Sequence, residues 1–388
     1  MKKLAIITTH PIQYNAPWFK LLTENNKVLP KVFYTWGKIE NETKYDPGFG
    51  KAVKWDIPLL EGYEYSFIKN ISNDPGSHHR NGIVNPTLIV EIEEWQPDAI
   101  LVFGWNFKSH LECIRHFYKK IPVIFRGDST LLDQVKGIKS FLRYIFLKWV
   151  YTHVDFALYV GTNNKNYFLK YGLKNKQLIL ATHAIDNERF AEPNSLYHAQ
   201  ATFLKEQLGI KPNDVVLLFA GKLEDKKNPL YLIQIMKEQS NPKLKLLYVG
   251  NGSLENILKN NALNDTRIMF LDFKNQLQMP AIYRIADLVI LPSKGPGETW
   301  GLSLNEAMAS GVAVSATYKT GGAIDLIEEG INGVLLDISN PCAINKIIDA
   351  SLLSKNKLVT MGKESQKKIS QFSFLKITNA IEQLLANL

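Results

Sequence analysis

The sequence predicts an α/β protein made of two tandem Rossmann-like domains. Short apolar runs with the length of buried strands alternate with helical patterns in the first half of the chain. The same alternation restarts after a polar seam that contains a proline, Glu192-Pro193-Asn194-Ser195. At 388 residues the chain is long enough for two domains of ordinary size. We therefore expect two doubly wound parallel sheets that face each other across a cleft at the carboxyl ends of their strands.

Each predicted strand is a short run rich in Val, Ile, Leu or Phe. The first series comprises Leu4 to Thr8, Lys31 to Tyr34, Ala99 to Phe103, Val123 to Phe125, Phe156 to Val160 and Leu178 to Ala181. The second comprises Val215 to Ala220, Leu244 to Val249, Ile268 to Leu271, Leu288 to Leu291, Val312 to Ala316 and Gly333 to Leu336. The predicted domains span residues 1–193 and 194–371, and a C-terminal helix over 372–388 is expected to pack back on the first domain.

Other segments of the first half carry weaker signals. A helix is expected to begin near Pro17, because proline suits the first helical turn. Residues 38–56 and 70–86 are rich in Gly, Pro, Asn and Asp, which is typical of long loops. His78, His79 and Arg80 lie in the second of these segments, and we interpret them as exposed loop residues.

The composition indicates a globular protein, with 45% hydrophobic and 21% charged residues. Cys113 and Cys342 are too few and too far apart for a disulfide framework or a zinc site. The apolar run Leu4 to Ile7 is too short for an export signal, and nowhere do 18 apolar residues follow one another. We expect a cytoplasmic protein, with peripheral attachment to the inner face of the plasma membrane as an open alternative.

The formal charge of +9 is concentrated, since residues 101–150 carry nine Lys or Arg against three acids. Within this segment, residues 136–151 interleave lysine and arginine with Phe, Tyr, Ile and Trp, which is the composition of a basic interfacial helix. An anionic membrane surface would be its partner. A buried helix with a solvated lysine edge explains the pattern equally well. Nucleic acid is a weaker interpretation, because no known binding motif accompanies the charge.

The stretch PSKGPGETWGLSLNEAMASG, residues 292–311, follows an apolar run and becomes helical after a Gly/Pro-rich turn. If the helix begins near Thr299, its first backbone N–H groups form an anion site. Glu298 and Glu306 would then lie about two turns, roughly 11 Å, apart and contact opposite ends of one extended ligand. The alternative is that both are ordinary helix acids.

Two further turns follow strands of the second series. GKLEDKK, from Gly221 to Lys227, brings lysines to a strand end, where two cations suit a diphosphate. A solvated lysine turn is the alternative. Gly250 and Gly252 occupy the next turn, in VGNGSLE, without the third glycine of a dinucleotide fingerprint.

Together these motifs resemble those of the retaining glycosyltransferases of family 4, of bacterial type, which have the GT-B fold. The resemblance rests on Glu-x7-Glu in ETWGLSLNEAMASG, on GKLEDKK, GNGSL and YRIADLVILPS, and on GGAIDLIEEGINGVLL, with Asp325 where the family has glutamate. In the first half, HPIQYNAP and FRGDS are similar to motifs of bacterial members, and AIDNERF resembles the segment that closes the first domain of the family. The resemblance covers most of the chain.

The resemblance implies a role for each matching residue. Glu306 would bind the ribose hydroxyls and Glu298 the hydroxyls of the donor sugar, while Lys222 and Lys227 would neutralise the diphosphate. Backbone N–H groups of Thr299, Trp300, Gly301 and Leu302 would hold the phosphates and the sugar. Gly250, Gly252 and the backbone near Phe273 would border the base. No cofactor or metal is expected, because no Asp-x-Asp pair is present and lysines would take the place of a metal.

The first half departs from the family pattern. His10-Pro11-Ile12-Gln13 replaces the usual Gly-Gly loop, so that His10, Gln13 and Tyr14 become the acceptor-side candidates. FRGDS stands where many members have a histidine. Arg126 is therefore a candidate for an anionic acceptor group and Asp128 for a catalytic hydroxyl contact, although a structural ion pair between them is an equal alternative.

These observations predict a retaining, metal-independent hexosyltransferase. It would move sugar from a UDP- or GDP-sugar to a glycan or lipid-linked glycan in surface polysaccharide synthesis. A GT-B-fold sugar-nucleotide epimerase and a non-catalytic sugar-nucleotide binding module stay open as alternatives. A Rossmann oxidoreductase is disfavoured, because no dinucleotide fingerprint follows the first strand.

Overall fold

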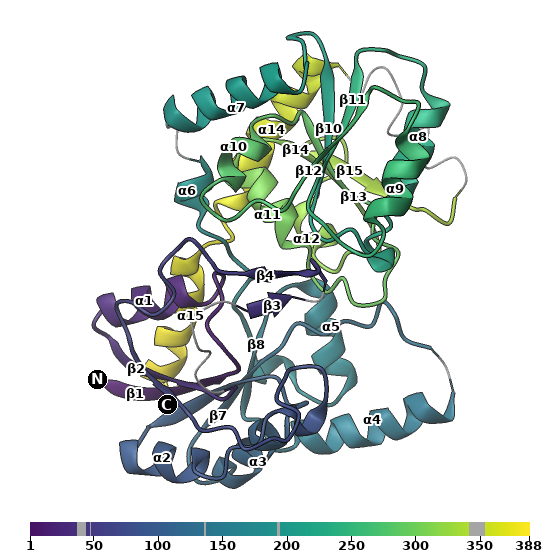
Figure 1. Ribbon diagram of the computed structural model, residues 1–388. Helices are drawn as coiled ribbons and strands as arrows, with labels where there is room; N and C mark the ends of the chain where they lie inside the picture. Colours follow the sequence, from purple (N-terminus) through teal and green to yellow (C-terminus); the bar gives the residue numbers. More distant parts are fainter. Residues whose placement is uncertain (37–43, 47, 136, 192–194, 341–353) are drawn as a thin grey trace. The chain divides into compact units, whose positions relative to one another are not determined.

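The computed structural model describes residues 1–36, 44–46, 48–135, 137–191, 195–340 and 354–388, and the chain forms two compact units (Figure 1). The first unit comprises Met1–Glu42, Pro58–His183 and Phe374–Leu388. The second comprises Thr43–Ile57 and Ala184–Ser373. The second unit thus includes a segment from the first half of the chain. Of the expected polar seam, residues 192–194 lie outside the described residues.

The first unit is organised around a seven-stranded sheet in the order β5-β2-β1-β6-β7-β8-β9, with every neighbouring pair parallel. Its strands are β1 (Lys2–Thr8), β2 (Val28–Tyr34), β5 (Glu64–Phe67), β6 (Ala99–Phe103), β7 (Val123–Arg126), β8 (Phe156–Tyr159) and β9 (Leu178–Leu180). Its helices are α1 (Ala16–Glu24), α2 (Leu88–Trp95), α3 (Lys108–Phe117), α4 (Ile138–Tyr151), α5 (Thr162–Lys170) and α15 (Phe374–Ala386). The run of wholly buried residues in β1 reflects a parallel sheet covered on both faces.

The second unit has a six-stranded parallel sheet in the order β12-β11-β10-β13-β14-β15. Its strands are β10 (Val215–Ala220), β11 (Leu244–Val249), β12 (Ile268–Leu271), β13 (Leu288–Leu291), β14 (Ala313–Thr317) and β15 (Gly333–Leu336). Its helices are α6 (Asn187–Ala191), α7 (Ser195–Gln207), α8 (Leu230–Glu238), α9 (Glu255–Ala262), α10 (Met279–Tyr283), α11 (Leu302–Ala309), α12 (Ala323–Leu326) and α14 (Lys355–Ile369). Two Rossmann-like sheets, as the sequence predicted, are confirmed.

Both sheets contain a topological switch point. In the second unit the first strand, β10, pairs with the second strand on one side and with the fourth on the other, so the strand order reverses between β10 and β13. In the first unit the reversal lies between β1 and β6. The loops that leave such neighbouring strands at their carboxyl ends diverge to opposite faces of the sheet and leave room for a ligand.

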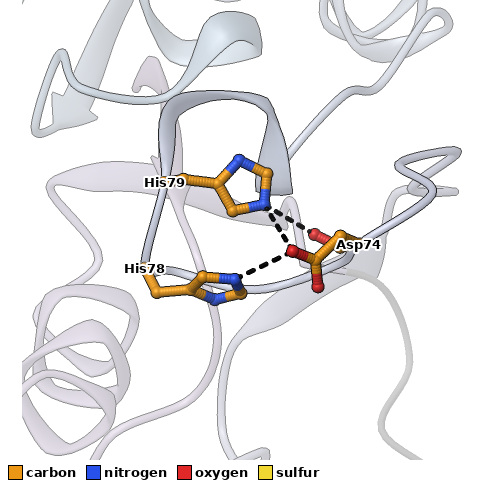
Figure 2. Close-up of side chains that lie close together, drawn as sticks. All are labelled: Asp74, His78 and His79. Carbon is orange, nitrogen blue, oxygen red and sulfur yellow. Dashed lines mark hydrogen bonds and ion pairs between the residues drawn. The ribbon is translucent and has the colours of Figure 1, made fainter.

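Two segments that were expected to be long loops contain regular structure. Residues 38–56 include a short antiparallel hairpin of β3 (Lys44–Asp46) and β4 (Lys51–Val53), which belongs to the second unit. This expectation was therefore wrong for the described part of the segment. Residues 70–86 contain a single 3-10 turn, Arg80–Gly82, and this loop brings Asp74, His78 and His79 together (Figure 2).

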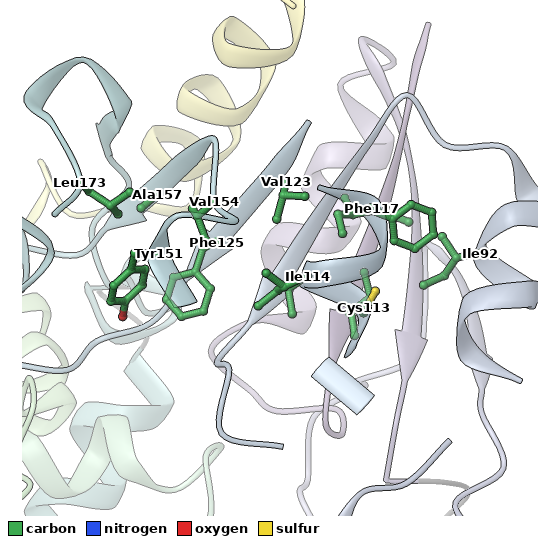
Figure 3. Close-up of a cluster of buried hydrophobic side chains, with 14 of the residues drawn as sticks. Ile92, Cys113, Ile114, Phe117, Val123, Phe125, Tyr151, Val154, Ala157 and Leu173 are labelled. Atoms are coloured by element: carbon green, nitrogen blue, oxygen red, sulfur yellow. The ribbon is translucent and has the colours of Figure 1, made fainter. Parts of the chain in front are cut away.

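The core of the first unit is continuous from α2 and α3 across β7 to α4 (Figure 3). Cys113 and Ile114 of α3 are fully buried in it, as is Val123 of β7. Burial in this apolar setting raises the pKa of the Cys113 thiol well above its ordinary value, which makes it a packing residue rather than a nucleophile. Cys342 lies outside the described residues.

The C-terminal helix α15 packs against α1 at the surface of the first unit. Its Glu382 accepts a hydrogen bond from Asn25 Nδ2 at 2.6 Å and pairs with Lys27 Nζ at 3.0 Å. Apolar residues of the same helix, Ile377, Ile381 and Leu385, are buried. None of the helices in the described ranges is long and apolar enough to cross a lipid bilayer.

A buried histidine joins the carboxyl ends of β2 and β6. His110 is wholly buried at the start of α3, where its Nδ1 lies 2.8 Å from the Phe103 carbonyl oxygen and its Nε2 lies 2.8 Å from Thr35 Oγ1. A carbonyl only accepts, so Nδ1 carries the proton and Nε2 accepts from the threonine. Burial lowers the pKa of His110 to about 4, and the ring is neutral in the folded chain at neutral pH.

This pKa makes the first unit sensitive to mild acid. An unfolded chain protonates His110 near pH 6.5, whereas the folded chain resists until about pH 4, so the stabilising contribution is complete above pH 6.5 and is lost as the pH falls toward 4. We expect protonation of His110 to lower the free energy of unfolding by about 3 kcal/mol. Urea unfolding of the wild type and of His110→Asn at pH 7 and pH 4.5 measures it. Equal pH dependence in the two proteins would contradict the assignment.

Candidate functional site

The turn that follows β10 is held against the turn that follows β11. Gly221 N donates to Val249 O at 3.0 Å, and Leu223 N donates to Asn251 O at 3.0 Å, so the parallel pairing continues beyond the strands. The side chain of Lys222 leaves the first turn at this edge of the sheet. The two turns therefore form one rigid support for the Lys222 side chain.

Gly250 and Gly252 are required by this close approach. A Cβ at Gly250 would lie 2.1 Å from Gly221 O, and one at Gly252 would lie 2.5 Å from Leu223 O. Gly250 also has a φ of 134°, which L side chains rarely adopt. The resemblance to family 4 implied that these glycines border the nucleotide base. In the structure their Cα atoms face the neighbouring turn, and a base contact for them stays a prediction.

An ion pair joins the loops that follow β10 and β13, at the switch point of the second sheet. Lys227 Nζ lies 2.6 Å from Glu298 Oε2, and the two side chains are 15% and 10% exposed. The Ser293 hydroxyl donates to the same carboxylate oxygen at 3.4 Å. Both charged residues were predicted site residues, although with different partners, and the structure brings them into contact.

The helix that carries Glu306 begins later than expected. Helix α11 starts at Leu302, not near Thr299, because Gly301 has a left-handed conformation at the N-cap, with a φ of 95°. The preceding loop is tied to the turn after β14 by bonds from Gly321 N to Glu298 O at 2.8 Å and from Gly322 N to Trp300 O at 3.0 Å. Thr299, Trp300 and Gly301 therefore lie in the loop, and only Leu302 among the four predicted N–H donors is helical.

Glu306 lies one turn into α11 rather than two, about 6 Å along the axis from Leu302. The residue is 4% exposed, and the hydroxyl of Tyr283, on α10, donates to its Oε2 at 2.8 Å. The phenol fixes the orientation of the carboxylate. Tyr283 was part of the YRIADLVILPS motif but was not assigned a role.

Trp300 has a structural side chain. Its indole Nε1 donates to Asn305 Oδ1 at 2.9 Å, its ring packs near Phe372, and the residue is 3% exposed. Any contact of Trp300 with a ligand would therefore come from its backbone, as the sequence prediction assumed.

Sequence reasoning missed an aromatic cluster in the second unit. Phe49, from the segment between β3 and β4, lies 4.7 Å from the ring of Phe273, and Trp55 lies 6.4 Å from the same ring. Lys222 Nζ lies 5.1 Å from the centre of the Phe49 ring. Asn275 Nδ2 anchors the segment by donating to Lys54 O at 2.6 Å. The cluster therefore links two predicted site residues, Lys222 and Phe273.

In the first unit, the loop after β1 places His10, Gln13 and Tyr14 at the switch point between β1 and β6. His10 Nδ1 lies 2.8 Å from Thr9 Oγ1, and its ring meets the edge of Trp36 at 5.1 Å. Gln13 is 8% exposed, whereas His10 and Tyr14 are half-buried. His10 and Tyr14 are therefore more accessible to a ligand than Gln13.

Arg126 ends β7 and Asp128 lies in the loop that follows it, and their side chains make different contacts. The Arg126 guanidinium is 3% exposed and donates to Ala181 O at 2.8 Å and to Thr182 O at 3.4 Å, which ties β7 to the end of β9. Burial lowers its pKa to about 10, so it stays charged. The Asp128 side chain is nearly half exposed, with Oδ2 lying 3.6 Å from His183 Nε2.

His183 is a further residue that the sequence reasoning overlooked. It comes just after β9, where a polar residue at a strand end is the usual signal of a site. Burial lowers its pKa, and the hydrogen bond with Asp128 works against that effect. At neutral pH a carboxylate and a mostly neutral imidazole stand side by side, and this pair can accept or relay a proton.

A hollow of about 690 Å³ lies elsewhere on the first unit, at the amino ends of β7 and β8. Its lining includes Lys119, Lys120, Lys174 and Lys176. It is at the opposite edge of the sheet from the switch point, where α/β sheets bind their ligands. We therefore assign the candidate site to the carboxyl ends.

Comparison with known proteins shows which family part of the chain matches and which solved structures share its fold. Residues 200–368 match the family described as glycosyl transferases group 1. The D-inositol 3-phosphate glycosyltransferase of Corynebacterium kroppenstedtii is 26% identical over 182 residues, which are 44% of this chain and 40% of that protein. The spore coat protein SA of Bacillus subtilis is 27% identical over 177 residues, 42% of this chain and 46% of that protein. The chain thus spans less than half the length of these curated relatives.

Among solved structures, HepE of Anabaena in complex with UDP and glucose is similar over the whole of both chains, with a TM-score of 0.70 and 20% identity. At this identity the likeness shows a shared fold of two Rossmann-like units.

The contact between the two glycine turns can be tested by Gly250→Ala. The added Cβ collides with Gly221 O, so we expect a loss of about 3 kcal/mol or more and displacement of the Lys222 turn. Gly209→Ala is the matched control, because Gly209 also has a positive φ, 67°, but has nothing within 4 Å of a new Cβ. Gly209→Ala should lower the free energy of unfolding by about 1 kcal/mol. Thermal unfolding of both variants measures the difference, and equal losses would refute the role given to the close approach.

Proposed function

We propose that the chain, whose residues 200–368 match the family described as glycosyl transferases group 1, is a retaining glycosyltransferase. A hexose-type sugar would move from a UDP- or GDP-sugar to a hydroxyl of a glycan or lipid-linked glycan, in surface polysaccharide synthesis. The observation that carries the proposal is the Lys227–Glu298 pair at the switch point of the second sheet. This is where a doubly wound sheet holds a nucleotide.

The ion pair gives donor binding a simple electrostatic basis. A diphosphate is attracted by Lys227 and Lys222 and repelled by the Glu298 carboxylate. Donor binding therefore requires the Lys227 ammonium either to lie between the phosphate and the Glu298 carboxylate, or to leave the carboxylate and pair with the phosphate. In either arrangement Glu298 Oε2 loses part of its contact with the lysine and becomes an acceptor for sugar hydroxyls. Glu306, held by Tyr283, would bind the ribose.

Lys227 would also act in the chemical step. The bond from the anomeric carbon to the donor phosphate oxygen breaks, and negative charge grows on that phosphate. A fixed ammonium stabilises this charge more in the transition state than in the bound donor. The acceptor oxygen bonds to the same face of the anomeric carbon, and its proton passes to the departing phosphate. No side-chain nucleophile is required, and the anomeric configuration is retained.

The aromatic cluster supports a boundary for the base. Phe49 and Trp55 lie beside Phe273, and Phe49 also lies beneath Lys222 Nζ, at the carboxyl edge where the base is expected. A flat base suits aromatic neighbours, because ring faces stack favourably. Phe49 is therefore proposed as a donor contact in addition to the residues found from the sequence.

A membrane-facing acceptor is supported by helix α4. Its apolar residues Ile138, Phe141, Leu142, Ile145 and Trp149 are between 80% and 39% exposed, although Leu147, Val150 and Tyr151 of the same helix are buried in the core. The exposed residues follow helical spacing and form one stripe opposite the buried face.

The positive charges on α4 also suit a membrane surface as the partner of this helix. At 3.6 residues per turn, Lys139 and Lys148 flank the apolar stripe on its two sides, and both are exposed. An apolar stripe between lysines matches an anionic lipid surface, where rings and aliphatic chains enter the interface and ammonium groups meet the headgroups. We therefore favour the interfacial helix over the alternative of a solvated lysine edge. Lys136, part of the sequence prediction, lies outside the described residues.

Loss of the donor contacts should separate binding from catalysis. Glu306→Ala should weaken nucleotide binding by about 10-fold to 100-fold, because a charged hydrogen bond to the ribose is lost. Lys227→Ala should lower kcat by about 100-fold and leave binding of the free nucleoside unchanged. Calorimetry and a transfer assay with a panel of UDP- and GDP-sugars measure both. Lys294→Ala, which removes an exposed lysine paired with Asp225, is the control.

Three outcomes of that assay would contradict the proposal. An inverted anomeric centre in the product, seen by NMR, would exclude the retaining mechanism. An epimer formed from nucleotide sugar without acceptor would indicate an epimerase instead. Nucleotide binding with no turnover for any acceptor would indicate a binding module.

Attachment to lipid can be measured by flotation with vesicles that contain or lack phosphatidylglycerol. We expect flotation only with the anionic vesicles, reduced more than 10-fold by the double variant Lys139→Glu/Lys148→Glu, since each lysine near the surface contributes about 1 kcal/mol. Phe141→Ser should also reduce it. Phe203→Ser removes a similarly exposed phenylalanine from α7 and should have no effect. Equal flotation with anionic and uncharged vesicles would contradict the proposal and leave the interpretation of α4 as a buried helix with a solvated lysine edge.

A further inference from the structure

The loop between β5 and α2 gathers three side chains whose atoms are typical metal ligands. His78 Nε2 lies 3.1 Å from Asp74 Oδ2, and His79 Nε2 lies 3.2 Å from the same oxygen, as Figure 2 shows. All three ligand atoms lie within 4.8 Å of one another. No role in sugar transfer was found for any of the three.

We propose that Asp74, His78 and His79 bind one divalent transition-metal ion of the zinc class. Two imidazoles and one carboxylate are a common ligand set for Zn²⁺. A tetrahedral ion with bonds of about 2.0–2.1 Å holds neighbouring ligand atoms about 3.3 Å apart. The separations of 3.1 and 3.2 Å are close to this value, so the ion enters with small movements of the side chains. The proposal does not depend on the transfer reaction.

The loop is held in shape by bonds that do not involve the three ligands. Asn70 Nδ2 donates to Gly82 O at 2.8 Å, and Asn70 Oδ1 accepts from Val84 N at 3.0 Å. Ser72 Oγ donates to Asn81 O at 2.6 Å. The two ends of the loop are thus fastened together, and little chain entropy is lost when an ion binds.

A glycine sets the orientation of one ligand. A Cβ at Gly76 would lie 2.4 Å from His78 Nδ1 and 2.6 Å from its Cε1, so the imidazole occupies the space that a side chain would fill. The ring lies against the glycine with Nδ1 and turns Nε2 toward Asp74. Gly76 is in this way a positioning residue for the site.

The electrostatics suit a cation. Hydrogen bonding from His78 holds the pKa of the Asp74 carboxyl below its ordinary value, so this ligand is anionic at neutral pH. Without metal, each Nε2 that donates to Asp74 carries a proton. On binding, that proton moves to Nδ1 of a neutral ring, and the Nε2 lone pair takes the ion. The three side chains are 37% to 72% exposed, which leaves the fourth position open to water.

Zinc binding by the full chain, stripped of metal and titrated with ZnCl₂ in a calorimeter, tests the proposal. We expect one ion per chain with a Kd in the micromolar range, and a loss of at least 10-fold in His78→Ala and in His79→Ala. Affinity should fall as the pH is lowered, because protonated imidazole is not a ligand. His198→Ala removes an exposed histidine of α7 and should leave the affinity unchanged.

Two further measurements distinguish the site from adventitious binding. Co²⁺ should give visible absorption bands of tetrahedral intensity in the wild type and lose them in His79→Ala. Gly76→Ala should weaken binding through displacement of His78, although it removes no ligand. The proposal is overturned if zinc does not bind, or if neither His78→Ala nor His79→Ala weakens binding.

Discussion

The pairing of β10 with β13 is the contact on which the candidate site depends. Leu217 and Leu218 of β10 lie beside Leu288 and Val289 of β13 in parallel register, although about 70 residues separate them in sequence. Because the strands are parallel, the loops that follow them leave the same edge of the sheet. Lys227 in one loop and Glu298 in the other then come within 2.6 Å. A change of register would move both charges without altering either residue.

The ion pair is costly unless the surrounding structure supports it. Two charges that are 15% and 10% exposed have lost most of their hydration, and their attraction offsets this only in good geometry. The loops supply that geometry through the bonds from Gly321 and Gly322 and the bond from Lys294 N to Lys226 O at 2.9 Å. Loops that are fixed in this way suit a binding site for an anion, because only the side chains of the ion pair have to rearrange when the ligand arrives.

Sequence reasoning was reliable where one physical signal dominated. Val215–Ala220 and Leu244–Val249 were predicted to the residue, since a run of six residues that is apolar throughout, or apolar except for Lys245, between polar turns leaves little choice. The GT-B fold implied by the motifs is confirmed. Sequence reasoning failed where contacts between distant segments determine the local structure. The start of α11 depends on Gly301 and on bonds from a distant turn, and the hairpin of β3 and β4 depends on Phe273, which lies more than 200 residues away.

Site residues show the same division. Lys227, Glu298 and Glu306 stand in motifs and could be named as candidates from the sequence, and their roles stay predictions. Their contacts could not be predicted, because one sequence does not show which loops of different strands touch. Tyr283 was missed although it lies in the YRIADLVILPS motif, and His183 was missed although it directly precedes the AIDNERF motif, since neither residue type is a charged partner by default. Asp74 was missed because only the fold of its loop brings it to His78 and His79.

The assignment of Thr43–Ile57 to the second unit bears on how such a chain can change over evolutionary time. The backbone passes between the units four times, after residues 42, 57, 183 and 373. A single genetic exchange near residue 184 between two related genes would therefore not swap whole units. It would join Phe49 of one parent to Phe273 of the other, and α1 of one to α15 of the other. Recombinant chains of this kind inherit mismatched aromatic and helical partners, so the two units are expected to diverge together.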